Sequence, residues 1–273
     1  MTSYKDQCIV ITGGATGIGF ALAKAFGAEG AKIVIGEPRQ EKLKAAAAEL
    51  SDLGVEVSTM VMDVTDPESM EAFANFAWGT YGTVHGLINN AGIGQPRKTV
   101  TDLPLGDLHR VFDVNFYGVW HGSAIFGKRM IEQGAPAFIY NVGSENSFFP
   151  AAPLMSAYVA TKHAVRGLTV AMREEFPEFI DIGLICPGFV KSDLTPPPFG
   201  EFAMDTNEFA AKVVEQIRTG EFYVVTHAYN TERYRPIHEE IDAAYAAHAP
   251  RYDGDEEYDV RTLIQKFMEA QGE

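Results

Sequence analysis

The amino-acid sequence predicts an α/β fold: a doubly wound parallel sheet of about seven strands, in a three-layer α/β/α arrangement with a C-terminal helical extension. Two observations predict it. Short apolar runs alternate with longer helical patterns through residues 1–190, as they do when helices connect parallel strands. A glycine-rich turn also joins the first apolar run to the first helical pattern.

The apolar runs give the strands. Each run is short, mostly apolar and bounded by turn residues, so it suits a strand that is buried on both faces. The predicted strands cover residues 8–11, 32–35, 57–61, 84–88, 137–140 and 182–185, and a seventh covers 222–226.

Helical patterns fill the segments between these runs. The clearest start is at Asp66, a suitable N-cap, which is followed by Pro67 at the first helical position. The predicted helices cover residues 19–30, 40–53, 67–81, 156 to near 177, 206–218, 234–245 and 260–270. No linker or break in composition marks a second domain. We therefore expect one domain over residues 1–273, with 226–273 as a helical extension of the same domain.

Charge narrows the classes of partner. The 273 residues include 37 acidic and 22 basic side chains, which gives a formal charge of −15. Nucleic acids and anionic membranes bind basic surfaces, so neither is expected as a partner. The apolar runs also stay far below the roughly 18 residues that a membrane span requires.

The N-terminus and the cysteines indicate a cytoplasmic protein. Residues 1–6 contain no apolar stretch like that of a signal peptide. Cys8 and Cys186 lie in apolar segments, which indicates buried reduced thiols rather than a disulfide. Cysteines and histidines do not occur at metal-ligand spacing, so no metal site is expected.

The glycine-rich turn is a candidate phosphate-binding site. Residues 12–19 (TGGATGIG) follow the first strand and open a helix, where backbone N–H groups and the helix dipole attract an anion. The glycines at 13, 17 and 19 permit a tight turn and the close approach of a pyrophosphate. The spacing is neither G-x-G-x-x-G nor that of a P-loop, and a plain strand-to-helix turn stays the alternative.

Acidic residues after the next two strands suggest how a dinucleotide would be selected. Glu37 ends the second predicted strand, where a carboxylate accepts hydrogen bonds from a ribose diol and repels a 2′-phosphate. This favours NAD over NADP, although Arg39 opposes that preference and leaves NADP open. Asp63 and Val64 end the third strand, where they would meet the adenine edge.

Tyr158 and Lys162 form a candidate acid–base pair. Their i, i+4 spacing puts the phenol and the ammonium on one helix face. A free tyrosine has a pKa near ~10, and a nearby cation lowers that pKa, as would a nicotinamide cation. The pair then suits proton transfer to or from a carbinol oxygen, with a plain surface pair as the alternative.

Two further polar residues belong to the same prediction. Ser144 follows the fifth strand, at the sheet edge where the glycine turn also lies, and its hydroxyl would hold the substrate oxygen. It lacks the G-x-S-x-G context of a hydrolase nucleophile. Asn115 is a polar residue in an otherwise apolar helix, which indicates either a backbone hydrogen bond or a helix kink with a water site.

Taken in order, these motifs resemble the short-chain dehydrogenase/reductase family over about residues 5–225. The motifs are TGxxxGIG at 12–19, Asp63-Val64, NNAG at 89–92, Asn115, Ser144, YxxxK at 158–162 and PG at 187–188. The resemblance implies a Rossmann-like fold and an Asn–Ser–Tyr–Lys tetrad. It also implies an NAD(P)-dependent enzyme that acts on CH–OH groups.

The resemblance assigns roles residue by residue. Tyr158 would be the acid/base, and Lys162 would lower its pKa and bind the nicotinamide ribose. Ser144 would orient the carbonyl or carbinol, and Asn115 would hold a relay water. Ser192 stands where the family usually has a threonine that contacts the carboxamide. The implied cofactor contacts are Gly13, Thr16, Gly17, Ile18, Gly19, Glu37, Asp63, Val64, Asn90, Ala91, Gly92, Tyr158, Lys162, Pro187, Gly188, Val190 and Ser192.

The expected function is hydride transfer between NAD(P) and a secondary alcohol or ketone. The tail beyond residue 226 is similar to a branch of the family that oxidises bulky, often aromatic alcohols. Apolar residues near the expected site suit such a substrate, although ordinary loop packing is the alternative. They are Phe148, Phe149, Met155, Phe189, Phe199, Phe202 and Met204.

The resemblance also implies a homodimer or homotetramer, built from the two long helices that contain Asn115 and Tyr158. Two other functions stay open. One is a non-redox lyase or dehalogenase on the same fold, in which the lysine or the nicotinamide site is usually lost. The other is an NAD(P)-sensing regulator without catalysis, which has no need of a complete tetrad.

Overall fold

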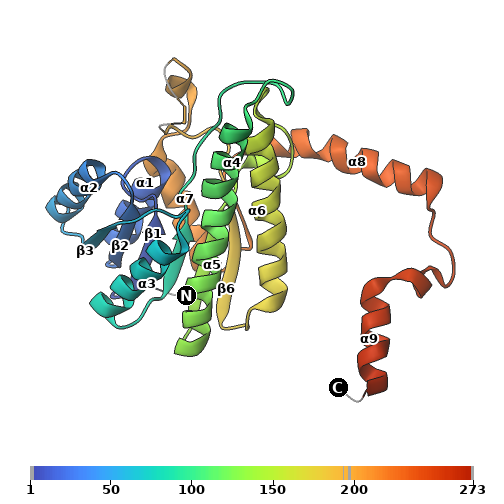
Figure 1. The fold of residues 1–273 in the computed structure, drawn as a ribbon, viewed down its shortest axis with the longest axis horizontal. Helices are drawn as coiled ribbons and strands as arrows, with labels where there is room; N and C mark the ends of the chain where they lie inside the picture. Colours follow the sequence, from blue (N-terminus) through green and yellow to red (C-terminus); the bar gives the residue numbers. More distant parts are fainter. Residues whose placement is uncertain (1–2, 193, 196–197, 272–273) are drawn as a thin grey trace. The chain divides into compact units, whose positions relative to one another are not determined.

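The computed structural model describes residues 3–192, 194–195 and 198–271. A seven-stranded sheet with the order β3-β2-β1-β4-β5-β6-β7 forms its centre, and neighbouring strands run parallel (Figure 1). The strands are β1 (Cys8–Thr12), β2 (Lys32–Glu37), β3 (Val57–Val61), β4 (Gly86–Asn89), β5 (Ala137–Val142), β6 (Ile180–Cys186) and β7 (Tyr223–Val225). The chain moves outward from β1 to β3 and then in the other direction from β4 to β7. This confirms the predicted doubly wound sheet.

Helices connect the strands. They are α1 (Gly17–Ala28), α2 (Gln40–Asp52), α3 (Pro67–Tyr81), α4 (Leu105–Phe112), α5 (Gly118–Gln133), α6 (Ser156–Glu175) and α7 (Thr206–Arg218). A π-helical turn, η1 (Asp113–Tyr117), joins α4 to α5, and short 3₁₀ turns occur at η2 (Glu145–Ser147) and η3 (Phe199–Phe202). The helix predicted around Asn115 is therefore two α-helices separated by a π turn.

Alternating side chains on the buried strands create two cores. In β1, Ile9 and Ile11 pack with α1, α2 and α7, whereas Val10 packs on the opposite face with α3, α5 and α6. All three are fully buried. Because each strand is apolar on both faces, both helical layers gain a hydrophobic surface, which produces the three-layer arrangement.

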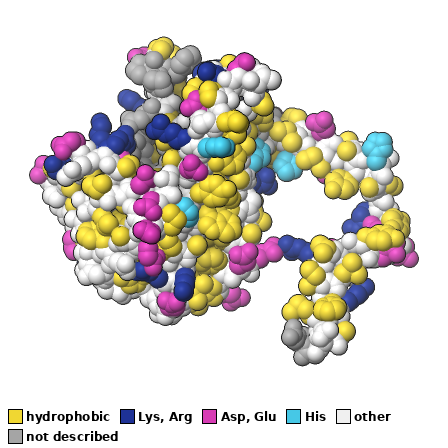
Figure 2. Space-filling model, viewed as in Figure 1, with side chains coloured by type: hydrophobic (Ala, Val, Ile, Leu, Met, Phe, Trp, Pro, Cys, Tyr) yellow, Lys and Arg dark blue, Asp and Glu magenta, His cyan; other side chains and the backbone are white. Residues whose placement is uncertain are grey.

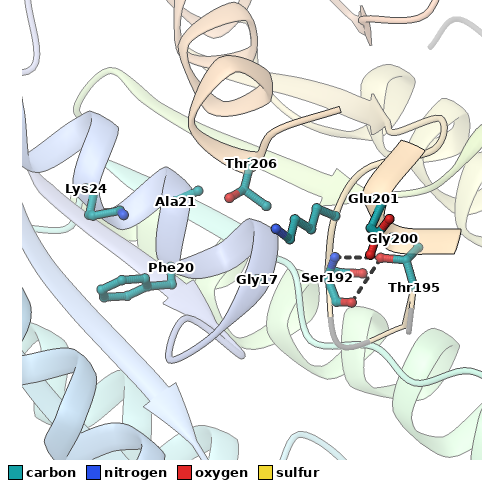
Figure 3. A pocket seen from close by; sticks show the side chains of 10 residues that line it. Gly17, Phe20, Ala21, Lys24, Ser192, Thr195, Gly200, Glu201 and Thr206 are labelled. Carbon is teal, nitrogen blue, oxygen red and sulfur yellow. Dashed lines mark hydrogen bonds between the residues drawn. The ribbon is translucent and has the colours of Figure 1, made fainter. Parts of the chain in front are cut away.

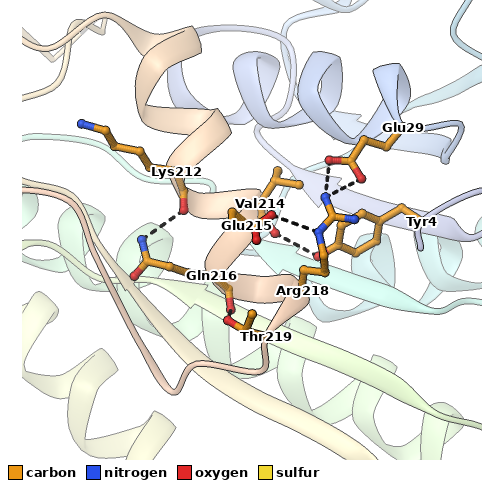
Figure 4. A network of polar contacts seen from close by, with 8 residues as sticks. All are labelled: Tyr4, Glu29, Lys212, Val214, Glu215, Gln216, Arg218 and Thr219. Carbon is orange, nitrogen blue, oxygen red and sulfur yellow. Dashed lines mark hydrogen bonds and ion pairs between the residues drawn. The ribbon is translucent and has the colours of Figure 1, made fainter. Parts of the chain in front are cut away.

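The N-terminal segment contacts helix α7 (Figure 4). The hydroxyl of Tyr4 donates a 3.1 Å hydrogen bond to the carbonyl oxygen of Val214 in α7. Arg218, near the end of α7, lies 5.1 Å from the Tyr4 ring centre and donates to both carboxylate oxygens of Glu29, at 2.5 and 2.6 Å. These contacts tie α7 to the end of α1.

Residues 229–273 form a second compact unit, separate from residues 1–228. It contains α8 (Asn230–His248), the short turn η4 (Asp255–Tyr258) and α9 (Val260–Gln271), which confirms both helices predicted there. The apolar residues of α9, such as Phe267 and Leu263, are exposed. That this unit extends the same domain stays a prediction. None of the helices described here combines the length and apolar character needed to cross a membrane.

Candidate active site

The carboxyl end of β1 leads into the glycine corner, residues 13–19. Gly13 and Gly17 have φ angles of +63° and +56°, in the left-handed region that glycine adopts with little strain. A Cβ on Gly13 would come within 2.9 Å of the Cα of Ala91. The corner therefore depends on glycine and packs closely on the loop that follows β4.

Asn90 supports the glycine corner from behind. Its Nδ2 donates to the carbonyl oxygens of Thr12 at 2.9 Å and Gly13 at 3.0 Å. The Thr12 hydroxyl in turn accepts hydrogen bonds from the backbone N–H groups of Asn90 and Ala91, at 3.0 and 3.1 Å. A Cβ on Gly19 would lie 2.4 Å from Asn90 Nδ2. The amide of Asn90, predicted to contact the cofactor, thus fixes the shape of the corner.

The start of α1 fits a diphosphate. The first N–H groups of a helix lack partners within it, and Thr16, which precedes α1, makes no capping hydrogen bond with its side chain. Ile18 packs against the core on the inner side of α1. Gly17 and Ser192 together line a hollow of about 830 Å³ beside the corner (Figure 3). Backbone donors and open space therefore occur together at this helix start.

Glu37 and Arg39 are paired at the end of β2. Arg39 Nε donates to Glu37 Oε1 at 2.6 Å, and Arg39 Nη2 donates to Glu37 Oε2 at 3.3 Å. Nη2 also donates to the hydroxyl of Thr16 at 3.2 Å. The Glu37 side chain is only 3% exposed, and that of Arg39 is 50% exposed. The two residues whose opposing effects the sequence predicted are thus in direct contact, beside the glycine corner.

Asp63 and Val64 shape the loop after β3. Asp63 Oδ1 accepts hydrogen bonds from the backbone N–H and the hydroxyl of Thr65, both at 2.9 Å. Val64 is buried, and its carbonyl oxygen lies 2.9 Å from Nδ1 of His121 on α5. Asp63 is exposed, and its contact with the adenine edge stays a prediction.

The loop after β6 closes the opposite side of the site. Pro187 accepts a 2.8 Å hydrogen bond from the N–H of Glu145, and the N–H of Gly188 donates to His227 Nδ1 at 3.2 Å. Val190 is buried and bridges to Met204. This loop delivers Ser192 to the glycine corner, where its Cβ lies 3.5 Å from the position of a Cβ on Gly17.

Tyr158 and Lys162 lie in the first two turns of α6. Lys162 is 4% exposed, and its Nζ donates a 2.8 Å hydrogen bond to the carbonyl oxygen of Val142 at the end of β5. The same Nζ is 5.6 Å from the centre of the Tyr158 ring. The phenol, the ammonium and the end of β5 therefore meet, as the spacing predicted.

The pKa of Tyr158 differs from the sequence-based expectation. Burial of its hydroxyl raises the pKa to about 12; a hydrogen bond with the Ser144 side chain acts in the opposite direction, and the charge of Glu145 raises the pKa further. Burial lowers the pKa of Lys162 to about 8, and the electrostatic interaction with Cys186 opposes that change. In the chain alone, desolvation thus outweighs the Ser144 hydrogen bond, and the phenol stays protonated at neutral pH.

Ser144 is held in place by its own loop. The residue is buried, and its Oγ accepts hydrogen bonds from the backbone N–H and the Nδ2 of Asn146, at 3.1 and 3.2 Å. Its backbone N–H donates to Ser147 Oγ, which in turn donates to the carbonyl oxygen of Lys162 at 2.8 Å. Ser144 is therefore fixed relative to Tyr158 and Lys162. The sequence did not indicate Asn146 as its partner.

Asn115, in the π turn, is hydrogen-bonded to the loop after β4. Its Oδ1 accepts from the N–H of Ile93 at 2.8 Å, and its Nδ2 donates to the carbonyl oxygen of the same residue at 2.9 Å. A Cβ on Gly92 would lie 3.4 Å from Asn115 Oδ1 and 3.8 Å from Lys162 Nζ. Asn115 and Lys162 thus both lie next to exposed Gly92, and the fourth tetrad residue joins the other three.

This geometry agrees with the comparisons to known proteins. The family model described as short chain dehydrogenase matches residues 7–199. The chain belongs to the short-chain dehydrogenase family. It is an oxidoreductase that acts on hydroxyl or keto groups and depends on NAD(P).

Individual relatives of this short-chain dehydrogenase cover most of its length. A 1-deoxy-11-beta-hydroxypentalenate dehydrogenase of Streptomyces avermitilis is 30% identical over 82% of this chain and 86% of its own. A 3-alpha-(or 20-beta)-hydroxysteroid dehydrogenase of Mycobacterium bovis is 38% identical over 68% and 70%. The crystal structure of a Burkholderia phymatum short-chain dehydrogenase/reductase in complex with NAD superposes with a TM-score of 0.83, at 27% identity, over 89% of this chain and 96% of that one.

The apolar residues that were predicted near the site of this dehydrogenase do not form one continuous surface. Phe148 packs edge-to-face on Tyr223, Phe149 is buried, and Met204 packs against the core of α1 and α7. Phe202 is 83% exposed. The side chain of Phe199 lies outside the described ones. Loop packing therefore accounts for several of these residues.

Proposed function

We propose that this short-chain dehydrogenase interconverts a secondary alcohol and a ketone, with Tyr158 as the acid/base. One observation carries the proposal: the Tyr158 phenol interacts with the Ser144 hydroxyl and lies beside the Lys162 ammonium, next to exposed Gly92. Proton donor, oxygen-orienting hydroxyl and cation therefore lie close together, as acid–base catalysis at a carbinol requires.

The residues of the chain divide the reaction between them. NAD, when bound, would supply the acceptor for the hydride. In alcohol oxidation the carbinol O–H bond breaks, its proton passes to the Tyr158 phenolate, and the C–H electron pair leaves with hydrogen as hydride. Ser144 orients the carbinol oxygen, and the Lys162 ammonium stabilises the phenolate. In the reverse direction the phenol returns its proton to the carbonyl oxygen.

We propose a bulky hydrophobic substrate. Two relatives are named for hydroxysteroid and hydroxypentalenate substrates. Half-buried Met155, immediately before α6, and exposed Phe202 supply apolar surface on loops. The test is the absorbance of reduced nicotinamide with a panel of bulky aryl and alicyclic alcohols and ketones. Oxidation or reduction of at least one compound is expected. Tight NAD binding without turnover across the whole panel would favour the regulator, and cofactor-independent turnover would favour the lyase.

We also propose that NAD is preferred over NADP, because the buried Glu37 carboxylate would face the ribose diol. Glu37→Gln is expected to weaken NAD binding about tenfold and to strengthen NADP binding, since the Arg39 guanidinium then loses its carboxylate partner. Titrating both cofactors side by side gives the two Kd values. Glu41→Gln, an exposed carboxylate at the start of α2, is the control and should change neither. Unchanged Kd values in Glu37→Gln would refute this assignment.

A homodimer or homotetramer is part of the proposal. Hydrophobic side chains gather on the face covered by α4, α5 and α6 (Figure 2). Tyr117, in η1, and Trp120, in α5, are 49% and 51% exposed, and both rings pack against Phe116. Light scattering should give at least twice the mass of one chain, and Trp120→Glu should reduce it; a monomeric wild type would contradict the assembly.

The cytoplasmic location stays a prediction.

A further inference from the structure

A buried glutamine connects the loop after β4 to the start of α6. Gln95 is 8% exposed, and its Oε1 accepts a 2.8 Å hydrogen bond from the backbone N–H of Tyr158. Its Nε2 donates to the carbonyl oxygens of Leu154 at 3.2 Å and Pro96 at 3.4 Å. One side chain therefore holds residues on both sides of the point where α6 begins.

The start of α6 needs such a contact. Tyr158 is the third residue of the helix, and N–H groups at this position have no acceptor within the helix. Met155, which precedes the helix, makes no capping hydrogen bond with its side chain. Gln95 therefore caps α6 from 63 residues away in the sequence.

The chain just before the helix is strained. Leu154 has a φ of +63°, which is unfavourable for a residue with a Cβ. Its carbonyl oxygen accepts hydrogen bonds from Gln95 Nε2 and, at 3.1 Å, from the N–H of Lys98. The loop after β4 thus keeps this strained turn in place and sets the direction in which α6 starts.

The other end of this loop is fixed by the π turn. Ile93, two residues before Gln95, is hydrogen-bonded to both the oxygen and the nitrogen of the Asn115 side-chain amide. Asn115 is therefore connected to Tyr158 in three steps. It is hydrogen-bonded to Ile93, the backbone runs from Ile93 to Gln95, and the Gln95 side chain is hydrogen-bonded to the Tyr158 N–H. Two residues of the tetrad, on different helices, are joined by this route.

We infer that Gln95 is a positioning residue, which places the Tyr158 phenol relative to Ser144 and Asn115 by holding the Tyr158 backbone. This rests on the proposed role of Tyr158 as the acid/base. A displacement of about 1 Å at a reacting group can reduce the rate as much as a hundredfold, so a lost helix cap at this residue affects catalysis as well as stability.

The test compares buried Gln95 with half-buried Gln133. Gln133, at the end of α5, also bridges two segments: its Oε1 accepts from Trp78 Nε1 and the N–H of Val84, both at 3.1 Å, and its Nε2 donates to the Val84 carbonyl oxygen at 3.0 Å. It lies beside Val84, before the start of β4, whereas Lys162 contacts the carboxyl end of β5. Methionine matches the length of glutamine without either hydrogen-bonding group. Gln133→Met is therefore the control for a purely structural loss.

Steady-state kinetics of ketone reduction separates the two roles. Gln95→Met should lower kcat about tenfold with the cofactor Kd unchanged, whereas Gln133→Met should leave kcat within about twofold of the wild type. Equal kcat values for Gln95→Met and Gln133→Met would overturn the inference.

Amide hydrogen exchange gives a readout without turnover. The Tyr158 N–H should exchange at least tenfold faster in Gln95→Met than in the wild type, and Gln133→Met should leave it unchanged. If the wild type reduces no ketone, the proposed function fails and this exchange rate alone decides the placement of Tyr158. Unchanged protection of the Tyr158 N–H in Gln95→Met would contradict it.

Discussion

Tyr158→Phe is expected to lower kcat about a thousandfold, because it removes the group that exchanges a proton with the carbinol oxygen. The ring stays in place, and the contacts of the glycine corner with the cofactor do not involve the hydroxyl. The Kd for NAD should therefore stay within about twofold of the wild type. Stopped-flow or steady-state absorbance of reduced nicotinamide measures the rate, and calorimetry measures cofactor binding.

Tyr81→Phe is the matched control for this variant. The Tyr81 hydroxyl lies 3.2 Å from Oγ of Ser58, in edge strand β3. It has no role in the proposed reaction. Its removal should leave kcat unchanged. If Tyr158→Phe kept more than about a tenth of the wild-type kcat, another group would have to move the proton and the assigned role would be wrong.

Lys162→Met should have the second largest effect, a loss of about a hundredfold in alcohol oxidation at pH 7. Oxidation requires the phenolate, and a positive charge favours the phenolate by lowering the pKa of Tyr158. Methionine has a similar length, so it fills the space of Lys162 without the charge. The pKa of Tyr158 should rise, and the rising limb of the pH–rate profile should move to higher pH.

The charges around this pair determine the sign of the shift. Desolvation and the charge of Glu145 raise the pKa of Tyr158, and the Ser144 hydrogen bond lowers it. Lys162→Met removes a positive charge that favours the phenolate, so the expected shift is toward higher pH. The profile of Lys212→Met, which removes an exposed lysine paired with Glu208 on α7, should match the wild type. A profile of Lys162→Met that rises at the same pH as the wild type would show that Lys162 does not tune the phenol.

Much of the fold follows from local patterns. Strands buried on both faces appear as uninterrupted apolar runs, and all seven predicted strands agree with the structure to within two residues at either end. The ends differ because hydrogen bonding to a neighbouring strand, not hydropathy, decides where a strand stops. Residues 105–133 were harder to divide, since a π turn at Asn115 has no distinct hydropathy pattern.

The site was predictable where it depends on spacing along one element. Tyr158 and Lys162 share a helix face because they are four residues apart, and the glycine corner is a continuous segment. Contacts between distant segments were not predictable. The hydrogen bonds from Ile93 to Asn115 and from Tyr158 to Gln95 join separate segments of the chain. Gln95 also belongs to none of the motifs. The burial that raises the pKa of Tyr158 also depends on the complete fold.

The central claim is that Tyr158 becomes a usable base only when positive charge surrounds it. Ultraviolet difference titration, wild type minus Tyr158→Phe, measures the ionisation of this phenol directly. Without cofactor, Tyr158 should not ionise until the pH approaches about 12. With saturating NAD, the transition should move to lower pH in the wild type and stay higher in Lys162→Met. A transition at the same pH with and without NAD would contradict the account.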